Sequence, residues 1–348
     1  QKLCDVRGAF DKYNLISGLH TYCSQENEIY KNILPPLSLL NKTEEEDLLN
    51  TLKELLRVAN GPVVVLGSGS NVILAHHFAG TVLVNKMQGI YLLHSCKDFV
   101  DIEVAAGENW HDFVVWSVGQ GFYGLENLAL IPGTVGAAPV QNIGAYGVDI
   151  SHFFVSCRVW DLQQKRIVVL SNKACKFSYR ASIFKSLAKG RYIILSVCLR
   201  LYQQARCCLT YPRLRQFFDD TAAATPQAVL AAVMSIRQQR LPDWEKIGTV
   251  GSFFVNPIVS KAQADNLRSK YKDMITIALP HGKVKLFAGD LLRLAGWRAY
   301  ADNALMTSAI NPIVLMHKGG ACRADLKAFV EKLILSVDRQ FQVRLQVE

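Results

Sequence analysis

The segment from residue 124 to residue 147 constrains this 348-residue chain more than any other, because glycine and alanine crowd it. Its glycines are Gly124, Gly133, Gly136, Gly144 and Gly147. Each glycine gives up side-chain packing and costs additional chain entropy on folding. That cost is understandable where the backbone lies flat against a large planar ligand, and also where a tight loop inside a core depends on glycine. The residues alone leave both interpretations open.

A second glycine-rich stretch, Gly67-Ser68-Gly69-Ser70-Asn71, follows an apolar run at 63–66 that predicts a short buried strand. Glycines let the backbone approach a ligand closely, and the N–H groups and two hydroxyls suit phosphate oxygens. A glycine- and serine-rich hairpin turn is the alternative interpretation. The stretch has neither Walker spacing nor a G-x-G-x-x-G pattern that opens a helix, so a Rossmann site is disfavoured.

Composition and charge favour a soluble globular protein of two or three domains, with 50% of the residues apolar and 20% charged. No apolar run approaches the roughly 18 residues of a membrane-spanning helix, and no basic region followed by an apolar stretch opens the chain. The formal net charge is +10, but the basic residues are dispersed. We therefore expect anionic small-molecule ligands, and neither nucleic acid nor a membrane as partner.

The nine cysteines are scattered, and none forms a C-x-x-C pair. This spacing disfavours both a zinc site and a dithiol redox centre, so we expect no bound metal. Several cysteines, such as Cys198, lie in apolar strand-like stretches, which indicates buried reduced thiols. A reducing cytoplasm is the expected compartment.

Hydrophobic periodicity predicts helices and strands without regular βαβ alternation, so the expected fold class is α+β. Helices are predicted over 44–56, 110–118, 226–238 and 325–337, with Thr225 as cap and Pro226 in the first turn of the third. Strands are predicted over 63–66, 81–85, 101–106, 192–201 and 252–255, with a hairpin over 159–170.

The two glycine-rich segments, together with five further motifs in the same order, closely resemble the UDP-N-acetylenolpyruvoylglucosamine reductase family. The further motifs are Gly107–His111, Tyr179–Lys185, Leu209–Tyr211, Arg240–Asp243 and Gly251–Pro257. The resemblance implies an FAD-binding fold of the vanillyl-alcohol-oxidase/PCMH type, with subdomains at 1–88 and 89–240. It also implies a C-terminal α+β substrate domain at 241–340 and a final segment, 341–348, that returns to the active site.

The family's chemistry implies a role in peptidoglycan precursor synthesis, and so in cell wall biogenesis, cell shape and cell division. Bound FAD, reduced by NADPH, would pass a hydride to the double bond of UDP-N-acetylglucosamine enolpyruvate, giving UDP-N-acetylmuramate. By the resemblance, Ser252 donates the proton, Arg180 holds the substrate carboxylate, and Glu348 is the third catalytic residue. A guanidinium fork suits a carboxylate because two parallel hydrogen bonds fix its orientation.

The resemblance also implies two sets of binding residues. FAD would contact Leu66, Gly67, Ser68, Gly69, Ser70, Asn71, Pro132, Gly133, Gly136, Ala137, Gln141, Asn142, Gly144, Ala145, Tyr146 and Gly147. The UDP-sugar would contact Tyr179, Tyr211, Arg240 and Asn256, with Tyr211 as the mobile tyrosine that covers the nucleotide in this type of reductase. Without the resemblance, Tyr211 reads as a strand-end aromatic and Arg240 as a cation at a helix C-terminus.

The chain departs from the family pattern at several positions. Ala181 replaces the usual aspartate, Val255 a common lysine, Asp290 a usual tryptophan, and Arg240 a lysine, while Glu348 is the last residue given. The competing readings are an FAD-linked oxidase of the same fold superfamily, or a degenerate, non-catalytic protein that binds flavin or nucleic acid. We expect a cytoplasmic monomer that uses FAD and NADPH.

Overall fold

The computed structural model describes residues 61–73, 78–220, 223–243 and 246–348, with single residues between 50 and 59. They divide into two compact units after Arg237. We call the described residues of 50–72 and 78–237 the N-terminal unit, and those from 238 onward, with Ile73, the C-terminal unit. The predicted helix over 44–56 lies largely outside the described residues. The expected boundary at residue 88 falls inside the N-terminal unit, and that at 240 falls close to the division.

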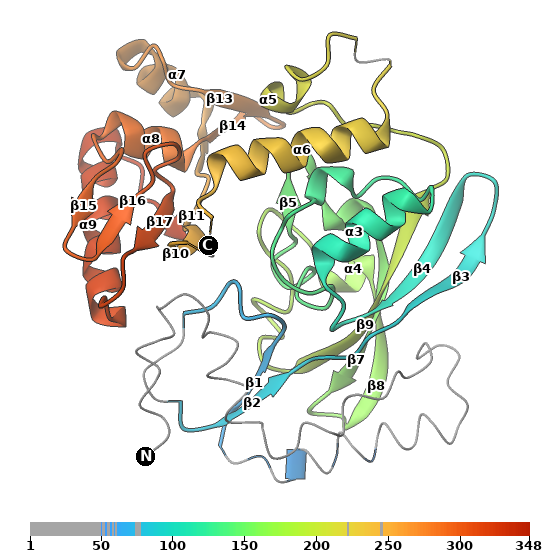
Figure 1. Cartoon of the computed structure of the whole chain (residues 1–348). Coiled ribbons are helices and arrows are strands. Elements are labelled where there is room, and N and C mark those ends of the chain that lie inside the picture. The colour runs from blue at the N-terminus through green and yellow to red at the C-terminus, as the bar shows by residue number, and fades with distance from the viewer. Residues whose placement is uncertain are drawn as a thin grey trace. The chain divides into compact units, whose positions relative to one another are not determined.

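A five-stranded antiparallel sheet forms the centre of the N-terminal unit, in the order β3-β4-β9-β7-β8 (Figure 1). Its strands are β3 Ile90–Ser95, β4 Phe99–Ala105, β7 Phe154–Asp161, β8 Arg166–Ser171 and β9 Tyr192–Tyr202. Along β9, Val197, Leu199 and Leu201 are fully buried, as expected of a central strand with one face on a core. The predicted strands over 101–106 and 192–201 and the hairpin over 159–170 are therefore confirmed.

Two helices supply apolar faces to the core of this unit. Helix α3, Trp110–Gly119, starts at Asn109, whose side chain accepts the N–H of Asp112. Helix α6, Pro226–Arg240, starts as predicted at Thr225, whose hydroxyl accepts the N–H of Ala228. Both predicted helices are confirmed, and each extends slightly beyond the predicted end.

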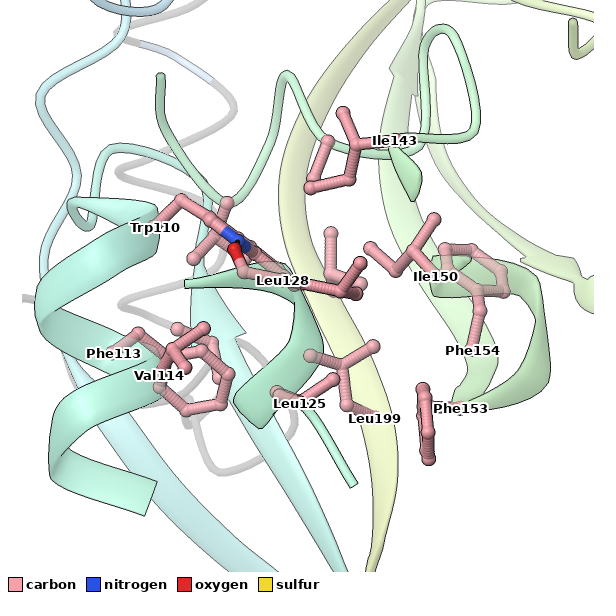
Figure 2. Close-up of a cluster of buried hydrophobic side chains, with 14 of the residues drawn as sticks. Trp110, Phe113, Val114, Leu125, Leu128, Ile143, Ile150, Phe153, Phe154 and Leu199 are labelled. Atoms are coloured by element: carbon pink, nitrogen blue, oxygen red, sulfur yellow. Dashed lines mark hydrogen bonds between the residues drawn. The ribbon is translucent and has the colours of Figure 1, made fainter. Parts of the chain in front are cut away.

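The glycine-rich segment 124–147 contributes to the same core through its leucines. Figure 2 shows Leu125 and Leu128 between side chains of α3 and Leu199 of β9. The indole N–H of Trp110 donates to the carbonyl of Leu128 at 2.9 Å, so the one polar atom of this buried ring is satisfied. Part of the segment is thus core, as one of the two open interpretations required.

Strands β1 (Val63–Leu66) and β2 (Thr81–Val84) form a separate two-stranded sheet, and they run parallel. A two-residue hairpin joins only antiparallel strands. The hairpin-turn interpretation of Gly67–Asn71 is therefore wrong. In β1 only Leu66 is buried and the other residues are half-buried, so the strand is less enclosed than predicted.

Short elements complete the N-terminal unit and carry many of the residues of interest. They are η2 Glu126–Leu128, β5 Gly144–Ala145, β6 Val148–Asp149, η3 Ile150–His152, α4 Asn172–Cys175 and α5 Pro212–Arg215. Strands β5 and β6 pair with each other in an antiparallel register.

The C-terminal unit contains three small sheets and three helices, in orange and red in Figure 1. The sheets are β10-β17-β16-β15 (Gly248–Ser252, Val314–His317, Leu305–Thr307, Ala301–Asp302), β12-β14-β13 (Ile258–Ser260, Lys283–Leu286, Thr276–Leu279) and β11-β18 (Phe254–Val255, Gln346–Val347). The helices are α7 Lys261–Lys270, α8 Ala288–Leu294 and α9 Arg323–Phe341. Helix α9 confirms the prediction over 325–337.

The strand predicted over 252–255 is wrong as a single element. Strand β10 ends at Ser252, and β11 begins at Phe254 and pairs with β18 instead. At the change of partner, Phe253 donates its N–H to the carbonyl of Ile313 and accepts the N–H of Glu348. A continuous apolar run cannot reveal such a change, because both strands show the same residue types.

Both units are mixed helix and sheet, so the α+β class is confirmed. In the described part of the chain, no helix is long and apolar enough to span a membrane.

Candidate functional site

The structure brings the two glycine-rich segments together within the N-terminal unit. The side-chain amide of Asn71 donates to the side-chain oxygen of Gln141 at 2.8 Å, across 70 positions of sequence. A Cβ added to Gly67 would lie 2.3 Å from Oγ1 of Thr134, which neighbours Gly133. The backbone of one segment therefore lies directly against the other, and only glycine at position 67 permits this approach.

The same region has features that fit an acidic, oxygen-rich ligand such as the diphosphate of FAD. The hydroxyl of Ser68 is buried and has no hydrogen-bond partner among the described residues. Buried polar groups nearly always have a partner, so this hydroxyl is available to a ligand. Gly69 is buried with a φ of 75°, a conformation that glycine adopts without strain. The residues present thus fit the phosphate cradle that the sequence predicts.

Gly136 holds the second segment close to the sheet. A Cβ at this position would lie 2.4 Å from the Cβ of Ala106, just after β4, and 3.0 Å from its backbone. Its N–H also donates to the carbonyl of Ala106 at 2.9 Å. The segment is therefore fixed to the end of a core strand.

Arg180 lies in a tight turn that is held on two sides. Ser178 and Ala181 exchange two backbone hydrogen bonds, of 3.0 and 3.1 Å. Asn142 donates its side-chain N–H to the carbonyl of Ser178 and accepts the N–H of Ser151. Arg180 itself has a φ of 55°, which is uncommon for a residue other than glycine. Strained backbone of this kind persists where surrounding contacts require it, and it concentrates at functional sites.

The guanidinium of Arg180 reaches across to strand β5. Its Nη2 donates to the carbonyl of Gly144 at 2.6 Å, and a Cβ added to Gly144 would lie 3.0 Å from its Nη1. The guanidinium carbon lies 5.5 Å from the ring centroid of Tyr179. Gly144 therefore makes room for Arg180.

Tyr146 and Tyr211 meet edge to face, with ring centroids 5.2 Å apart. Asn127, which is fully buried, donates its two amide N–H groups to the carbonyls of Tyr146 and Cys208, each at 2.9 Å. A Cβ on Gly147 would lie 2.3 Å from Oγ1 of Thr210. The chain segment that ends at Tyr211 is thus held against the loop that carries Tyr146.

Burial controls the ionisation of the groups around this loop. It raises the pKa of Tyr146 and of Tyr211, so both phenols stay protonated and can donate hydrogen bonds. Burial also lowers the pKa of His111, whose Nδ1 accepts the N–H of Leu130 at 3.2 Å. His111 is therefore expected to be neutral at physiological pH.

The C-terminal unit brings Ser252 and Glu348 to neighbouring positions. Ser252 is exposed at the end of β10, and the N–H of Glu348 donates to the carbonyl of the next residue, Phe253, at 2.9 Å. The β11–β18 pairing sets this register, with Phe254 opposite Val347. A hydroxyl and a carboxyl-bearing residue therefore belong to one edge of this unit.

Two further residues predicted to contact the UDP-sugar are Asn256 and Arg240. The side-chain oxygen of Asn256 accepts the N–H of Ala288 at 2.9 Å, at the start of α8. Arg240 is the last residue of α6 and is half-buried.

The departures from the family pattern differ in structural role. Asp290 accepts the N–H of Ile275 and pairs with Arg293 at 2.7 Å, so its carboxylate stabilises the start of α8. Val255 pairs with Gln346 in the β11–β18 sheet, where the backbone makes the contact. Ala181 contributes its backbone to the Arg180 turn.

Sequence reasoning missed Asn127 and Arg237. Asn127 carries no signal of its own, since a single asparagine in a short helical turn is ordinary. Arg237 did carry a sequence signal, because it lies four residues after Val233 and so on the apolar side of a predicted amphipathic helix. The described residues contain no group of three or more His, Cys, Asp and Glu side chains that could hold a metal ion.

Comparison with known proteins identifies the family. Residues 37–171 match the FAD binding domain, and residues 242–348 match the C-terminal domain of UDP-N-acetylenolpyruvoylglucosamine reductase. The chain is 41% identical over 304 residues to the UDP-N-acetylenolpyruvoylglucosamine reductase of Cupriavidus pinatubonensis, covering 87% of this chain and 90% of that protein. The chain belongs to the UDP-N-acetylenolpyruvoylglucosamine reductase family.

Other reductases of this family agree. The Pseudomonas aeruginosa UDP-N-acetylenolpyruvoylglucosamine reductase is 39% identical over 312 residues, which is 89% of this chain and 91% of that protein. The crystal structure of the Thermus caldophilus reductase covers 85% of this chain and 88% of its own, with a TM-score of 0.55 and 20% identity, and so shares the fold. The predicted family, FAD-binding fold and flavin-dependent oxidoreductase class are confirmed.

Proposed function

We propose that this reductase converts UDP-N-acetylglucosamine enolpyruvate to UDP-N-acetylmuramate in peptidoglycan precursor synthesis. The observation that carries the proposal is the hydrogen bond between Asn71 and Gln141, which joins the two glycine-rich segments. The segment that contains Gln141 also accepts a hydrogen bond from the guanidinium of Arg180, at the carbonyl of Gly144. Family membership supplies the reaction class.

Two sets of residues would hold FAD. The loop from Gly67 to Asn71 would bind the diphosphate through N–H groups and the free hydroxyl of Ser68. The segment from Pro132 to Gly147 would lie along the ring system. When bound, FAD accepts a hydride from NADPH and delivers one to the substrate double bond.

Arg180 would bind the substrate carboxylate. Hydride addition to the enolpyruvyl double bond places negative charge on the neighbouring carbon and on the carboxylate. A guanidinium held by a rigid turn and by Gly144 stabilises this charge without having to reorganise during the reaction.

Ser252 would donate the proton to that carbon, and Glu348 would assist it. An aliphatic hydroxyl is a very weak acid at neutral pH, so a neighbouring group or water must support its proton transfer. The pairing of β11 with β18 supports a role for Glu348, because it brings the last residue beside Phe253.

The remaining assignments concern substrate contacts and organisation. Tyr179, Tyr211, Arg240 and Asn256 would contact the UDP-sugar. The FAD subdomains at 1–88 and 89–240, the substrate domain at 241–340, and the return of 341–348 to the active site belong to the same proposal, as do a cytoplasmic location and a monomeric state.

The reaction is tested by mixing NADPH-reduced protein anaerobically with UDP-N-acetylglucosamine enolpyruvate and following flavin absorbance. We expect reoxidation of the flavin together with formation of UDP-N-acetylmuramate. An oxidase would give a different result. Its reduced flavin would persist with this substrate and reoxidise with oxygen, and a sugar or alcohol would be consumed as the flavin is reduced again.

The role of Ser252 is tested by Ser252→Ala. We expect flavin reduction by NADPH to persist, while the reoxidation step slows by about 100-fold or more, the size typical of a lost acid–base group. Ser260→Ala is the matched control, since Ser260 caps α7 through the N–H of Gln263 and has no assigned role in the reaction. Unchanged reoxidation in Ser252→Ala would remove Ser252 from the mechanism.

A further inference from the structure

The motif Gly107–His111 has no part in the reaction proposed above, yet it lies against the second glycine-rich segment. Its backbone pairs with that segment at two points. The N–H of Trp110 donates to the carbonyl of Gly133 at 3.1 Å, and the N–H of Val135 donates to the carbonyl of Glu108 at 2.9 Å. The motif therefore fixes the backbone of the segment from Gly133 onward.

Two side chains at the start of α3 fix the part of the segment that comes before Gly133. The indole N–H of Trp110 donates to the carbonyl of Leu128 at 2.9 Å. The imidazole Nδ1 of His111 accepts the N–H of Leu130 at 3.2 Å. The short turn from Leu130 to Gly133 is therefore held at both of its ends by the same motif.

Leu130 has a φ of 55°, which is uncommon for a residue other than glycine. Such a conformation persists where surrounding contacts require it, and the bond to His111 is one of these contacts. The turn leads through the exposed Pro132 to Gly133, where an added Cβ would lie 3.5 Å from Oγ of Ser70 in the first glycine-rich segment. The conformation of Leu130 thus decides where Pro132 and Gly133 lie beside that segment.

His111 can hold Leu130 in this way only while its ring is neutral, because both nitrogens of a protonated imidazole are donors. Burial lowers the pKa of His111 from its ordinary value of 6.5. Two charged groups also act on the ring: the carboxylate of Asp112 on α3 opposes this shift, and the guanidinium of Arg237 on α6 adds to it. The accepting form therefore prevails at neutral pH and is lost as the pH falls through the lowered pKa.

We propose that His111 is a positioning residue for the flavin, since its neutral Nδ1 holds Leu130 and thereby places Pro132 and Gly133 against the cofactor. The inference rests on the proposed function, in which Pro132 and Gly133 contact FAD. Protonation of His111 would set a donor against the N–H of Leu130 and release the turn. FAD would then bind best above the pKa of His111, and its affinity would fall as the pH decreases through that value.

The test measures the dissociation constant of FAD without NADPH or substrate, so that no turnover enters. Flavin-loaded protein is diluted in series at pH 8 and at pH 5, and the fluorescence of released FAD is read at equilibrium. For the wild type we expect binding to weaken by about threefold or more at pH 5. His111→Leu has no acceptor and should weaken binding at pH 8 by about 5- to 50-fold, as for a buried donor left without a partner.

His111→Asn is the conservative variant that separates positioning from bulk packing. Its side-chain oxygen can take the place of Nδ1 as acceptor, and it does not titrate. We expect a dissociation constant within about twofold of the wild type at pH 8, and a much smaller loss at pH 5. The matched controls are His94→Asn and His94→Leu, the same substitutions at an exposed position of β3, which should keep both the wild-type affinity and its pH dependence.

Several results would overturn the inference. They are wild-type affinity that does not change with pH, equal pH dependence in the wild type and His111→Asn, and unchanged affinity at pH 8 in His111→Leu. If His111→Leu does not fold, the comparison of the wild type with His111→Asn still decides. Wild-type protein that binds no FAD at either pH would overturn the flavin contacts of the proposed function together with this inference, whereas protein that binds FAD but does not reduce the enolpyruvyl substrate would overturn the proposed reaction alone.

Discussion

The proposed catalytic residues are supported very differently in the two units. In the N-terminal unit, Arg180 lies in a hydrogen-bonded turn that Asn142 holds and Gly144 receives. In the C-terminal unit, Ser252 is exposed, and Glu348 depends on a two-residue strand whose residues are both exposed. The difference shows that the proposed catalytic residue of one unit is built into a core, whereas those of the other depend on a local edge contact.

Backbone strain near the proposed catalytic residues follows the same division. Asn142, Tyr146 and Arg180 all adopt positive φ values between 49° and 55°, which side chains other than glycine rarely adopt. Next to Ser252, the positive φ of 68° belongs to Gly251, whose added Cβ would meet nothing within 4 Å. Tight packing tolerates the strain in the N-terminal unit, whereas the C-terminal edge needs none.

The largest effect is expected from a variant that lacks residues 346–348. Turnover should fall by about 100-fold or more because Glu348 and the β11 partner are both lost. The free energy of unfolding should change by less than about 1 kcal/mol, because the removed strand is exposed. Flavin reoxidation measures the turnover, and urea unfolding measures the free energy of unfolding.

Glu348→Gln separates the two contributions, because it keeps the backbone hydrogen bond to Phe253. A comparable loss of turnover in this variant assigns the effect to the carboxylate. Full activity in Glu348→Gln would show that the strand alone matters, and full activity in the shortened chain would remove both from the mechanism.

A smaller effect, on stability, is expected from Gly136→Ala in the N-terminal unit. The new methyl would meet the Cβ of Ala106 at 2.4 Å and its backbone at 3.0 Å, so the chain must shift. We expect a loss of about 1–3 kcal/mol in the free energy of unfolding, as for other overpacked cores, with weaker flavin retention. Thermal and urea unfolding of flavin-loaded protein measure it.

Gly119→Ala is the matched control for that substitution. Gly119 is the last residue of α3, and nothing lies within 4 Å of an added Cβ. We expect no loss, or a gain of up to about 1 kcal/mol from better helix propensity. Equal destabilisation by both variants would contradict the packing argument.

A third effect is the acid dependence of stability contributed by Asp161. Its buried carboxylate accepts a 2.6 Å bond from Arg191, and that hydrogen bond is the main reason why the pKa of Asp161 lies below its ordinary value. A lowered pKa stabilises the fold above the ordinary value of about 4, and this stability is lost as pH falls through the folded pKa.

Asp161→Asn cannot titrate, so its free energy of unfolding should fall less between about pH 5 and pH 2 than that of the wild type. Asp265→Asn, at a surface pair with Arg268, is the control and should keep the wild-type slope. An unchanged slope in Asp161→Asn would show that this carboxylate gains nothing on folding.

The smallest effect concerns thiol reactivity in the native state, where only the thiolate reacts. Burial raises the pKa of Cys198 to about 12, and Cys157 and Cys175 are buried in the core. Cys322 of the C-terminal unit is exposed. Among the cysteines of the described residues, iodoacetamide should therefore modify Cys322 first, as followed by peptide mass spectrometry, and Cys322→Ser should remove that early product. Early labelling of Cys157 would contradict the described core.

The main sheet and the long helices could be predicted from the sequence because they carry strong periodic patterns. Two-residue strands such as β5 and β18 could not, since so short an element has no period. The parallel pairing of β1 with β2 was hidden for another reason. Only the spatial partner distinguishes it from a hairpin, and the intervening glycines fit both.

The candidate site was predictable to a similar degree. Composition and resemblance indicated Gly67–Asn71 and Gly124–Gly147, but not the bond between Asn71 and Gln141, because nothing local specifies a contact across 70 positions. Arg237 was missed because one residue at helical spacing after Val233 does not show that its side chain is buried. Its burial is visible only in the fold.

The double amide contact of Asn127 limits how Tyr211, the proposed cover of the nucleotide, can move. Because Asn127 ties the carbonyl of Cys208 to that of Tyr146, the hinge for Tyr211 must begin after Cys208. Pro212 has a restricted φ at the start of α5 and limits bending on the other side. Release of the nucleotide would then require only the rotation of a few bonds around Thr210, while the anchor beneath it stays in place.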